Sequence, residues 1–495
     1  MANDVKRRDF LKMTAAGVGA AAAFSGFAPE KVEAASKVKF GMEADVVVVG
    51  GGGGGLASAV EAAALGSKVI LIEKTKLMGG ASIICGGQLA FAGTDLQASK
   101  NVKDSNELFY KDLLKVGENV NDLNQVKAYI DNQLDTYNWL KAAGIKFYNL
   151  SAMSGMSVPR SHQVKPAEVI KTLTDLAKAK GVNIIMECAA KRLIIDCGTG
   201  KVRGIVAEKD GKEIKIGASK GIILASGGFS RNKDLLAKFV PLMANSKAIT
   251  GLGNFGDGLK MAWASGADIK DMPYIKATFG QHPTSPGIGD RMLIFYQGAI
   301  IVNKEGKRYV KESISYKLLG DAVFEQPGSV GYSIYDKAIR DDEMKNGLRR
   351  VAGIEKKGLV YEAATIDELA QKAGLPAAAL KETINRYNND VKTGKDKQFG
   401  RDTLVAGYGK PVEIKNPPFY AFPCTGAILG TYGGILINKD ARVLNIYGEP
   451  INGLYAAGEI AGGLHGAAYM TGTAFGKALV FGRIAARTVC GKKAS

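Results

Sequence analysis

The sequence predicts an α/β protein in which parallel strands alternate with helices and an α+β domain is inserted late in the chain. Residues 45–49, DVVVV, form a β-branched run of the kind that is buried on both faces of a parallel sheet, and an alanine-rich helix pattern follows soon after it. Between about 272 and 424 this alternation gives way to mixed segments. A chain of 495 residues, 46% apolar and 23% charged, is long enough to bury two or three cores.

The first residues have the pattern of an export signal. Arg7 and Arg8 precede a weakly apolar Ala/Gly-rich run, and Ala34 ends a stretch suited to processing. The string RRDFLK resembles the twin-arginine signal that carries folded proteins across a membrane. We therefore expect residues 1–34 to be a twin-arginine signal peptide, the mature protein to be periplasmic, and no stable membrane insertion after cleavage. An uncleaved anchor is the alternative, although 13–28 falls short of the roughly 20 residues that span a bilayer.

Charge and cysteine content exclude several classes of protein. The net charge is +18, but the lysines are dispersed and are not interleaved with aromatic residues, so we expect no nucleic-acid partner. The five cysteines include no C-x-x-C pair and no C-x-x-C-H, so neither a zinc ribbon nor covalent c-type haem is encoded, and any haem must sit on another chain. With only three histidines, far apart in sequence, no metal site is expected.

A run of six glycines at 50–55 follows the first strand pattern. Read as G-x-G-x-x-G, it places Gly50 at a tight turn, Gly52 where backbone approaches a pyrophosphate, and Gly55 where a helix packs on the strand. The next strand pattern, KVILIE, ends on Glu73, near the spacing at which a carboxylate accepts ribose hydroxyls. Together these features predict a Rossmann-like dinucleotide-binding domain.

Two further glycine pairs help to distinguish between dinucleotides. The stretch KTKLMGGASIICGG at 74–87 places glycines at 79, 80, 86 and 87, directly after the acid. Backbone without side chains can lie along a long, flat ligand, so these pairs favour FAD over NAD.

At this point the chain resembles the flavoprotein superfamily that contains the fumarate reductase and succinate dehydrogenase flavoprotein subunits and the ketosteroid dehydrogenases. Four more segments resemble that superfamily in order: GIILASGGFSRN at 221–232, NFGDGLKMAWASGAD at 254–268, GGILINKDARVL at 433–444 and INGLYAAGEIAGG at 451–463. The resemblance covers nearly the whole mature chain. It implies a glutathione-reductase-type FAD-binding domain formed by 40–271 and 425–490, with a capping domain at 272–424.

The resemblance also implies that FAD is bound without a covalent link. Membrane-bound members attach the flavin through a histidine near the second glycine pairs, where ASIICGG has none, and Cys85 is expected to pack under the flavin instead. Glu459 is expected on the ribityl side. The residues expected to bind FAD are Gly50, Gly52, Gly53, Gly55, Glu73, Lys74, Gly80, Ala81, Ser82, Gly86, Gly87, Ala225, Gly227, Gly228, Asp257, Glu459 and Ala474.

An electron donor on another chain is a further implication. Members with their own haem or flavin-mononucleotide domain carry extra sequence before the nucleotide fold, and here only the signal precedes it. We expect an external donor, such as a c-type cytochrome or a quinol-linked protein, and a small unsaturated molecule as substrate.

The cap carries the strings that distinguish the superfamily's reactions. His282, in QHPTSPG, matches the histidine that helps to hold a substrate carboxylate in fumarate reductases, with a hydrogen-bonded turn histidine beside Pro283 as the alternative. Tyr316 stands where those enzymes have the arginine that protonates substrate, Gly430 replaces a second histidine, and Tyr469 replaces the arginine of the closing loop. Because one arginine to carboxylate contact contributes about 1.5 to 3 kcal/mol, losing both arginines argues against fumarate as substrate.

Tyrosines at these two places resemble the ketosteroid dehydrogenases instead. The resemblance implies that Tyr469 hydrogen-bonds a substrate carbonyl, that Tyr316 exchanges the proton at the α carbon, and that flavin N5 exchanges the hydride at the β carbon. The alternative for each tyrosine is packing in the cap or loop, with its hydroxyl bonded to backbone.

Five other residues carry weaker signals. Arg308 and Glu312 are expected to form a structural ion pair of the cap. Arg160 and His162, in SVPRSHQ, are expected to line the substrate entrance, and His465 to hold the flavin loop through backbone contacts.

These expectations describe an exported FAD enzyme that reduces an activated C=C bond in an enone, enoate or aryl-acrylate. The reductive direction is favoured because respiratory electron carriers reach the periplasm whereas soluble nicotinamides are scarce there. One alternative is a 3-ketosteroid-type dehydrogenase that introduces a C=C next to a ketone with the same residues. A second is a flavin electron-transfer subunit without carbon chemistry of its own.

Overall fold

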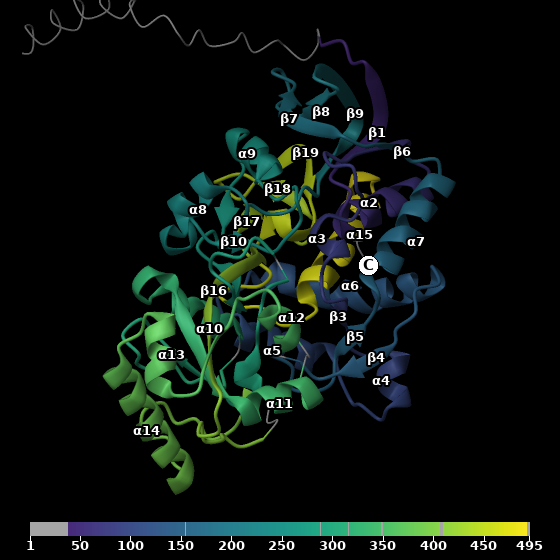
Figure 1. The fold of residues 1–495 in the computed structure, drawn as a ribbon. Coiled ribbons are helices and arrows are strands. Elements are labelled where there is room, and N and C mark those ends of the chain that lie inside the picture. The colour runs from purple at the N-terminus through teal and green to yellow at the C-terminus, as the bar shows by residue number, and fades with distance from the viewer. Residues whose placement is uncertain are drawn as a thin grey trace, which may run out of the picture.

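The computed structural model of the chain describes residues 38–153, 155–287, 289–314, 316–347, 350–405 and 409–492, so the expected signal peptide at 1–34 lies outside the described residues. Two hydrophobic cores hold the described chain together. One draws mainly on residues 44–277 and 428–489, and the other on 279–424. Figure 1 shows the second as the green elements gathered at one end of the molecule.

The first core is built on an eight-stranded sheet with the path β18-β19-β9-β1-β2-β6, to which β8 and β7 are added beside β9. The central strands pair in parallel: β1 with both β2 and β9, β9 with β19, and β2 with β6. At the side of β9, β8 pairs antiparallel with both β9 and β7. The strands are β1 (Met42–Val49), β2 (Val69–Ile72), β6 (Asn183–Ile185), β7 (Cys188–Ile195), β8 (Val202–Lys209), β9 (Lys212–Leu224), β18 (Arg442–Leu444) and β19 (Pro450–Ala456).

β1 and the helix after it, α2 (Gly53–Ala64), form where the sequence predicts them. The side chains of Val46, Val47 and Val48 are fully buried, as the β-branched run between two neighbouring strands requires. The alanine-rich α2 ends before Gly66, whose φ of 81° lies in the left-handed region that favours glycine. The chain therefore passes from β1 through α2 to the parallel strand β2, which is one βαβ unit.

Helix α15 (Thr473–Val489) packs against α2, so the first and last parts of the described chain lie side by side (Figure 1). A Cβ at Gly482 would lie 2.5 Å from the carbonyl oxygen of Gly54, so only glycine lets the two helices approach this closely. The hydroxyl of Ser58 lies within hydrogen-bond distance of both carbonyl oxygens, at 2.8 Å from that of Gly54 and 2.9 Å from that of Gly482. The other helices of this part are α3 (Gly80–Ile83), α4 (Asp95–Ser99), α5 (Asn106–Val116), α6 (Leu123–Ala142), α7 (Pro166–Ala179), α8 (Lys233–Phe239) and α9 (Asp257–Ala264).

The second core belongs to the cap, whose six-stranded sheet follows β10-β16-β14-β13, with β12 and β15 also pairing with β16. The strands are β10 (Lys247–Ala248), β12 (Ile275–Gln281), β13 (Ile300–Val302), β14 (Gly331–Asp336), β15 (Tyr361–Ala363) and β16 (Phe419–Thr431). The helices are α10 (Tyr316–Phe324), α11 (Lys337–Asn346), α12 (Val351–Glu355), α13 (Ile366–Ala373) and α14 (Ala377–Thr393). The domain boundary expected at 424 falls inside β16, which pairs with β12 as far as Thr431.

Two small sheets complete the fold. One contains β11 (Ile269–Lys270), β17 (Gly434–Leu436) and β20 (Ala461–Gly462), and the other β3 (Gln88–Ala90), β4 (Asn149–Ser151) and β5 (Ser161–Gln163). Among the described residues, no helix combines the length and the apolar character needed to cross a membrane.

Candidate active site

Three parallel strands end side by side at one edge of the large sheet. Val49 of β1 and Ala456 of β19 both lie opposite Leu224 of β9, the last residue of its strand. The turns that follow these strands line one cavity of about 430 Å³. Because ligands of open α/β sheets bind at the carboxyl ends of the strands, this cavity is the expected place for a nucleotide.

The turn after β1 forms a cradle for an anionic group. Gly50 has φ 113°, and a Cβ at Gly55 would lie 1.8 Å from the Gly50 carbonyl oxygen, so glycine is required at both positions. The first turn of α2 carries no acidic residue, and its helix dipole favours a phosphate, although the N–H of Gly53 already donates to Ser82 Oγ at 3.1 Å. Glu73 fixes the turn from the end of β2, because its carboxylate accepts the N–H of Gly51 at 2.7 Å and that of Thr75 at 2.8 Å.

Two buried hydroxyls that belong to cavity-lining residues have no hydrogen-bond partner in the described part of the chain. They are Ser226 Oγ, in the turn after β9, and the phenol oxygen of Tyr432, just after β16. Leaving such a group unsatisfied costs about 1 to 3 kcal/mol. These atoms fit a cavity that holds a polar ligand.

Charged side chains from several segments also line the cavity. Lys74 forms an ion pair with Asp257 at 2.6 Å, and the Lys74 ammonium lies 5.0 Å from the centre of the Phe255 ring. The carboxylate of Glu459 accepts the N–H of Thr431 at 3.0 Å. Burial raises the pKa of Glu459, so a ligand there meets a carboxyl group that is harder to ionise.

Lys477 is a cavity residue that the sequence did not reveal, because it reads as one lysine among many in a helix pattern. It lies on α15, is 2% exposed, and donates a hydrogen bond to the carbonyl oxygen of Ala461. Burial lowers the pKa of Lys477 to about 8.

Most residues expected to bind FAD line the cavity: Gly50, Gly52, Gly53, Glu73, Lys74, Gly80, Ala81, Ser82, Ala225, Gly227, Asp257, Glu459 and Ala474. Gly55, Gly86, Gly87 and Gly228 do not. A Cβ at Gly87 would lie 2.2 Å from the Val164 carbonyl oxygen, and one at Gly228 would lie 2.1 Å from Thr431 Oγ1. These two glycines, like Gly55, allow close packing, whereas a Cβ at Gly86 would meet no atom. A glycine motif alone therefore does not tell which glycines contact a cofactor and which only allow close packing of the chain.

Tyr469 lies in the loop before α15, next to Lys276 of β12. Its hydroxyl accepts the N–H of Gly472 at 2.9 Å, and its ring stacks on the Tyr432 ring with centroids 6.3 Å apart. The ammonium of Lys276, which lines the cavity, lies 3.6 Å from the Tyr469 ring centroid. Burial alone would lower the pKa of Lys276, yet Tyr469 and Tyr316 raise it above the ordinary lysine value. No motif in the sequence marks this lysine.

Tyr316 is the first residue of α10, which packs on β12. A Cβ at Gly320 would lie 2.9 Å from the carbonyl oxygen of Thr278, and farther along the helix the Phe324 ring covers Gly426 of β16. Tyr316, one turn before Gly320, therefore falls toward the end of β12 that carries Lys276. Tyr469 thus lies at the Lys276 ammonium beside the cavity, and Tyr316 begins α10 toward the same end of β12.

His282, expected among the catalytic residues, lies just after β12, six residues beyond Lys276. It is not among the residues that line the cavity. Its Nδ1 accepts the N–H of Ser285 at 3.1 Å, and its ring lies 5.6 Å from the Phe422 ring. These contacts fit a hydrogen-bonded turn histidine, and a role of His282 in holding a substrate carboxylate stays a prediction.

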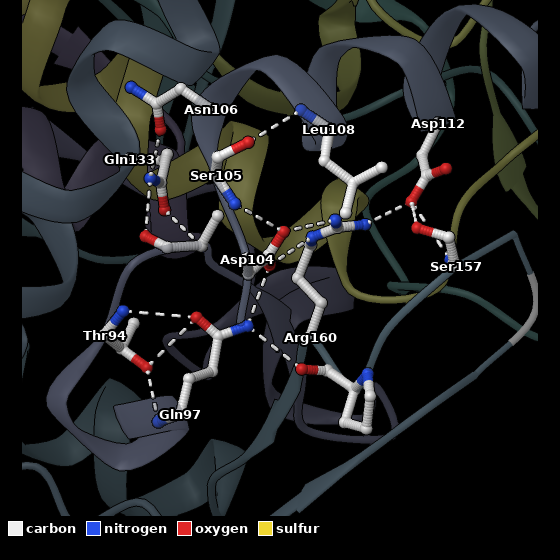
Figure 2. Close-up of polar contacts among 12 residues, drawn as sticks. Thr94, Gln97, Asp104, Ser105, Asn106, Leu108, Asp112, Gln133, Ser157 and Arg160 are labelled. Carbon is white, nitrogen blue, oxygen red and sulfur yellow. Dashed lines mark hydrogen bonds and ion pairs between the residues drawn. The ribbon is translucent and has the colours of Figure 1, made fainter. Parts of the chain in front are cut away.

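Arg160 and His162 were wrongly expected to line the substrate entrance. The Arg160 side chain is fully buried between two carboxylates, at 2.6 Å and 2.8 Å from the oxygens of Asp104 and 2.7 Å from Asp112 (Figure 2). His162 is also fully buried, with Nε2 2.8 Å from Thr94 Oγ1, and burial lowers its pKa to about 4. The two acids that neutralise Arg160 lie too far away in sequence to be recognised as its partners.

The remaining expectations concern an ion pair in the cap and two residues near the closing loop. The structural ion pair of Arg308 and Glu312 is confirmed, with two contacts of 2.8 Å and 2.7 Å, both side chains being buried. His465 lines the cavity, but its ring holds the loop by packing against Tyr432 and Tyr469 rather than through backbone contacts. Gly430 also lines the cavity and pairs with Lys276 across the β12–β16 ladder.

Cysteine and metal chemistry have little support at the site. Cys85 lines the cavity, and burial raises the pKa of its thiol, which disfavours the thiolate. Within the described ranges, no group of three or more His, Cys, Asp or Glu side chains is placed to hold a metal ion.

The glycine cradle, the helix N-terminus and the long cavity define a dinucleotide-binding flavoprotein. Comparison with known proteins identifies the family. The chain belongs to the FAD binding domain family, and the sequence pattern of that family matches residues 45–474. FAD is its cofactor, and the chain is an FAD-dependent oxidoreductase of the fumarate reductase-like kind that acts on C=C bonds.

Two curated relatives span most of the chain. A "Fumarate reductase (cytochrome)" of Shewanella frigidimarina is 35% identical over 449 residues, which cover 89% of this chain and 76% of that protein. An "Acrylate reductase flavoprotein subunit" of Shewanella woodyi is 29% identical over 501 residues, which cover 97% of each.

Two solved structures have the same fold. The open form of a flavocytochrome c3 fumarate reductase matches with TM-score 0.79 and 29% identity, over 99% of this chain and 81% of that one. A 3-ketosteroid-Δ4-(5α)-dehydrogenase from Rhodococcus jostii RHA1 matches with TM-score 0.76 and 27% identity, over 92% of this chain and 99% of that one.

Proposed function

We propose that the protein is a periplasmic reductase of an activated C=C bond, supplied with electrons by a separate cytochrome or quinol-linked donor. The observation that carries this proposal is the contact of the Lys276 ammonium with the Tyr469 ring, beside the cavity that fits FAD. When bound and reduced, FAD supplies the hydride that the β carbon of the substrate receives.

Tyr469 polarises the substrate. Its oxygen accepts the N–H of Gly472, so the ring is held in place and its own O–H remains able to donate to a substrate oxygen. The nearby ammonium of Lys276 stabilises the negative charge that grows on that oxygen as the β carbon is reduced.

Tyr316 supplies the proton to the α carbon. It starts helix α10 of the cap toward the Lys276 end of β12, which supports this role. A positioned acid of this kind contributes typically 10² to 10⁴ in rate.

Fumarate is not the preferred substrate in this proposal. The relatives include proteins named as fumarate reductases and as acrylate reductases, so family membership alone does not distinguish between these substrates. Two tyrosines take the expected arginine positions, and a phenol cannot neutralise a carboxylate as a guanidinium does. An enone, enoate or aryl-acrylate with at most one carboxylate fits this set of side chains better.

The relatives and the N-terminal sequence, rather than the site, support a separate electron donor and export of the protein. One relative is named as a flavoprotein subunit and matches over nearly the full length of both chains, and another is named for a cytochrome. The twin-arginine pattern before residue 38 favours the periplasm, where such carriers operate.

The test is a Tyr316→Phe substitution. Dithionite should reduce the bound FAD of the variant as it does in the wild type, while reoxidation by a C=C substrate should slow by about 10² to 10⁴, measured by stopped-flow absorbance of the flavin. Tyr447→Phe, at a position that is 80% exposed, is the matched control and should change neither step. If Tyr316→Phe reoxidises at the wild-type rate, the electron-transfer subunit without carbon chemistry becomes the better description.

A further inference from the structure

Lys477 is a buried cation to which the proposed reaction gives no role. It lines the cavity from α15, is 2% exposed, and donates to the carbonyl oxygen of Ala461. Within the described ranges no carboxylate forms an ion pair with its ammonium, whereas the buried Arg308 and Arg483 have carboxylate oxygens at 2.7 Å and 3.0 Å. A buried charge without a neutralising partner is costly, and an anion in the cavity would offset that cost.

Lys477 lies on the side of α15 away from the glycine cradle. The residues of α15 that line the cavity are Ala474, Phe475, Lys477 and Ala478. With 3.6 residues per turn, Phe475 and Lys477 stand on the two flanks of that face, and the alanines stand between them. A Cβ at Gly53 would lie 2.9 Å from the Phe475 ring, so Phe475 is on the cradle side and Lys477 is on the other.

A series of contacts connects Lys477 to the end of the cavity that carries Lys276. Ala461, which accepts the Lys477 hydrogen bond, follows Glu459 by two residues. The Glu459 carboxylate accepts the N–H of Thr431 at 3.0 Å, and Thr431 directly follows the residue that pairs with Lys276 across β12 and β16. In a dinucleotide whose pyrophosphate lies in the cradle, the flavin rather than the adenosine belongs at this end.

Other titratable groups act on Lys477 or lie near it. They are Glu459 in the turn after β19, Asp271 just after β11, His465 in the loop before α15 and Lys276 on β12. Burial lowers the pKa of Lys477 to about 8, although both carboxyl groups act in the opposite direction. Burial also lowers the pKa of His465, so its imidazole stays neutral above pH 7, whereas Lys276 stays charged because nearby tyrosines outweigh the effect of burial on its pKa.

We propose that Lys477 is a redox-linked proton site, whose ammonium balances the negative charge of reduced FAD and whose side chain holds its proton more tightly when the cofactor is reduced. Reduction by two electrons and one proton leaves FAD with one more negative charge, and a fixed cation beside the flavin stabilises that charge. This inference rests on FAD as the cofactor and not on any particular substrate.

The proton balance follows from this role. Where Lys477 is already protonated, reduction of the holoprotein takes up two electrons from the donor and one proton. Where Lys477 is neutral in the oxidised protein, a second proton from solvent binds its Nζ on reduction. Each proton taken up changes the reduction equilibrium tenfold per pH unit, which is about 30 mV for a two-electron couple.

Wild-type holoprotein provides the first test. Its midpoint potential is measured by spectroelectrochemical titration from about pH 7 to about pH 9.5, without substrate. We expect the potential to fall by about 30 mV per pH unit below about pH 8 and by about 60 mV per pH unit above it, because the ammonium loses its proton there only in the oxidised protein. A fall of about 30 mV per pH unit over the whole range would overturn the proposal.

Substitutions of Lys477 separate its charge from its proton. Lys477→Met should lower the potential near pH 7 by at least about 30 mV, a tenfold change, and the difference from wild type should shrink toward pH 9.5. Lys477→Arg keeps a charge that does not titrate in this range, so it should keep the wild-type potential near pH 7 but fall by only about 30 mV per pH unit throughout. Lys439→Met is the matched control and should change neither value, because Lys439 is 68% exposed and lies outside the cavity lining.

The outcomes distinguish this inference from the proposed function. If Lys477→Met has the wild-type potential near pH 7, or keeps a steeper fall above pH 8, Lys477 is not the proton site, although C=C reduction is unaffected. If wild type reduces no unsaturated compound, the proposed function fails while the redox linkage stands. Should Lys477→Met lose its FAD, the wild-type slope alone decides.

Discussion

The chemistry of the site depends on a few buried or half-buried cations that reach it from different segments. Lys276 lies over the Tyr469 ring, and Lys477 lies on α15 below the same cavity. Each is costly to bury alone, so each indicates a bound partner or a hydrogen bond that offsets the burial. For Lys477 the hydrogen-bond partner is a neutral carbonyl oxygen, and the carboxyl groups of Asp271 and Glu459 offset only part of the effect of burial on its pKa.

The lowered pKa of Lys477 makes the stability of the fold depend on pH. The pKa of Lys477 is about 8 in the fold, against about 10.4 in an unfolded chain. Between these values the unfolded state binds more protons, so stability rises with pH across the window, and below about pH 8 the fold bears the whole burial penalty.

Lys477→Met removes this dependence. In urea unfolding of flavin-free protein, the stability of the variant relative to wild type should be greatest near pH 7 and fall by about 3 kcal/mol toward pH 10.5. A difference that stays constant with pH would show that Lys477 is not a buried cation with a lowered pKa.

At the scale of elements, the packing of α10 on β12 positions the acid of the reaction. Gly320 allows this contact, because a Cβ there would meet the backbone of Thr278. The same contact sets the distance between Tyr316, at the start of α10, and Lys276, on β12.

Gly320→Ala should therefore push α10 away from β12. We expect FAD to remain bound and C=C reduction to fall about tenfold or more, since a shift of about 1 Å in a catalytic group can cost up to 10²-fold. Gly353→Ala in α12 is the control, because a Cβ there meets no atom, and it should keep full activity. Equal activity in both variants would mean that the α10–β12 contact does not position Tyr316.

The contrast between elements also explains how far the sequence could predict this molecule. The β1–α2–β2 unit is local: its strand, glycines and acid lie within one stretch, and the structure has them as predicted. The catalytic surroundings are not local. Lys276 reaches the cavity only through the pairing of β12 with β16, and His282 matched a motif but lies just after β12, outside the lining of the cavity.

At the scale of the whole molecule, two cores meet at the active site. The flavin part supplies most of the cavity, the cap supplies Lys276 and the proposed acid Tyr316, and β16 runs through both the cap sheet and the cavity wall. The account therefore makes the cap, rather than the FAD cradle shared across the family, the part that selects the substrate.

The most direct test is anaerobic reoxidation of the dithionite-reduced holoprotein. It is mixed in a stopped-flow instrument with acrylate, trans-cinnamate, urocanate, an enone and fumarate, and oxidation of the corresponding saturated acids is assayed with a dye acceptor. We predict that one of the compounds with at most one carboxylate reoxidises the flavin at least about tenfold faster than fumarate, and that the dye-linked oxidation is slower than reduction. Fumarate as the fastest oxidant, or a strong preference for the oxidative direction, would contradict the account.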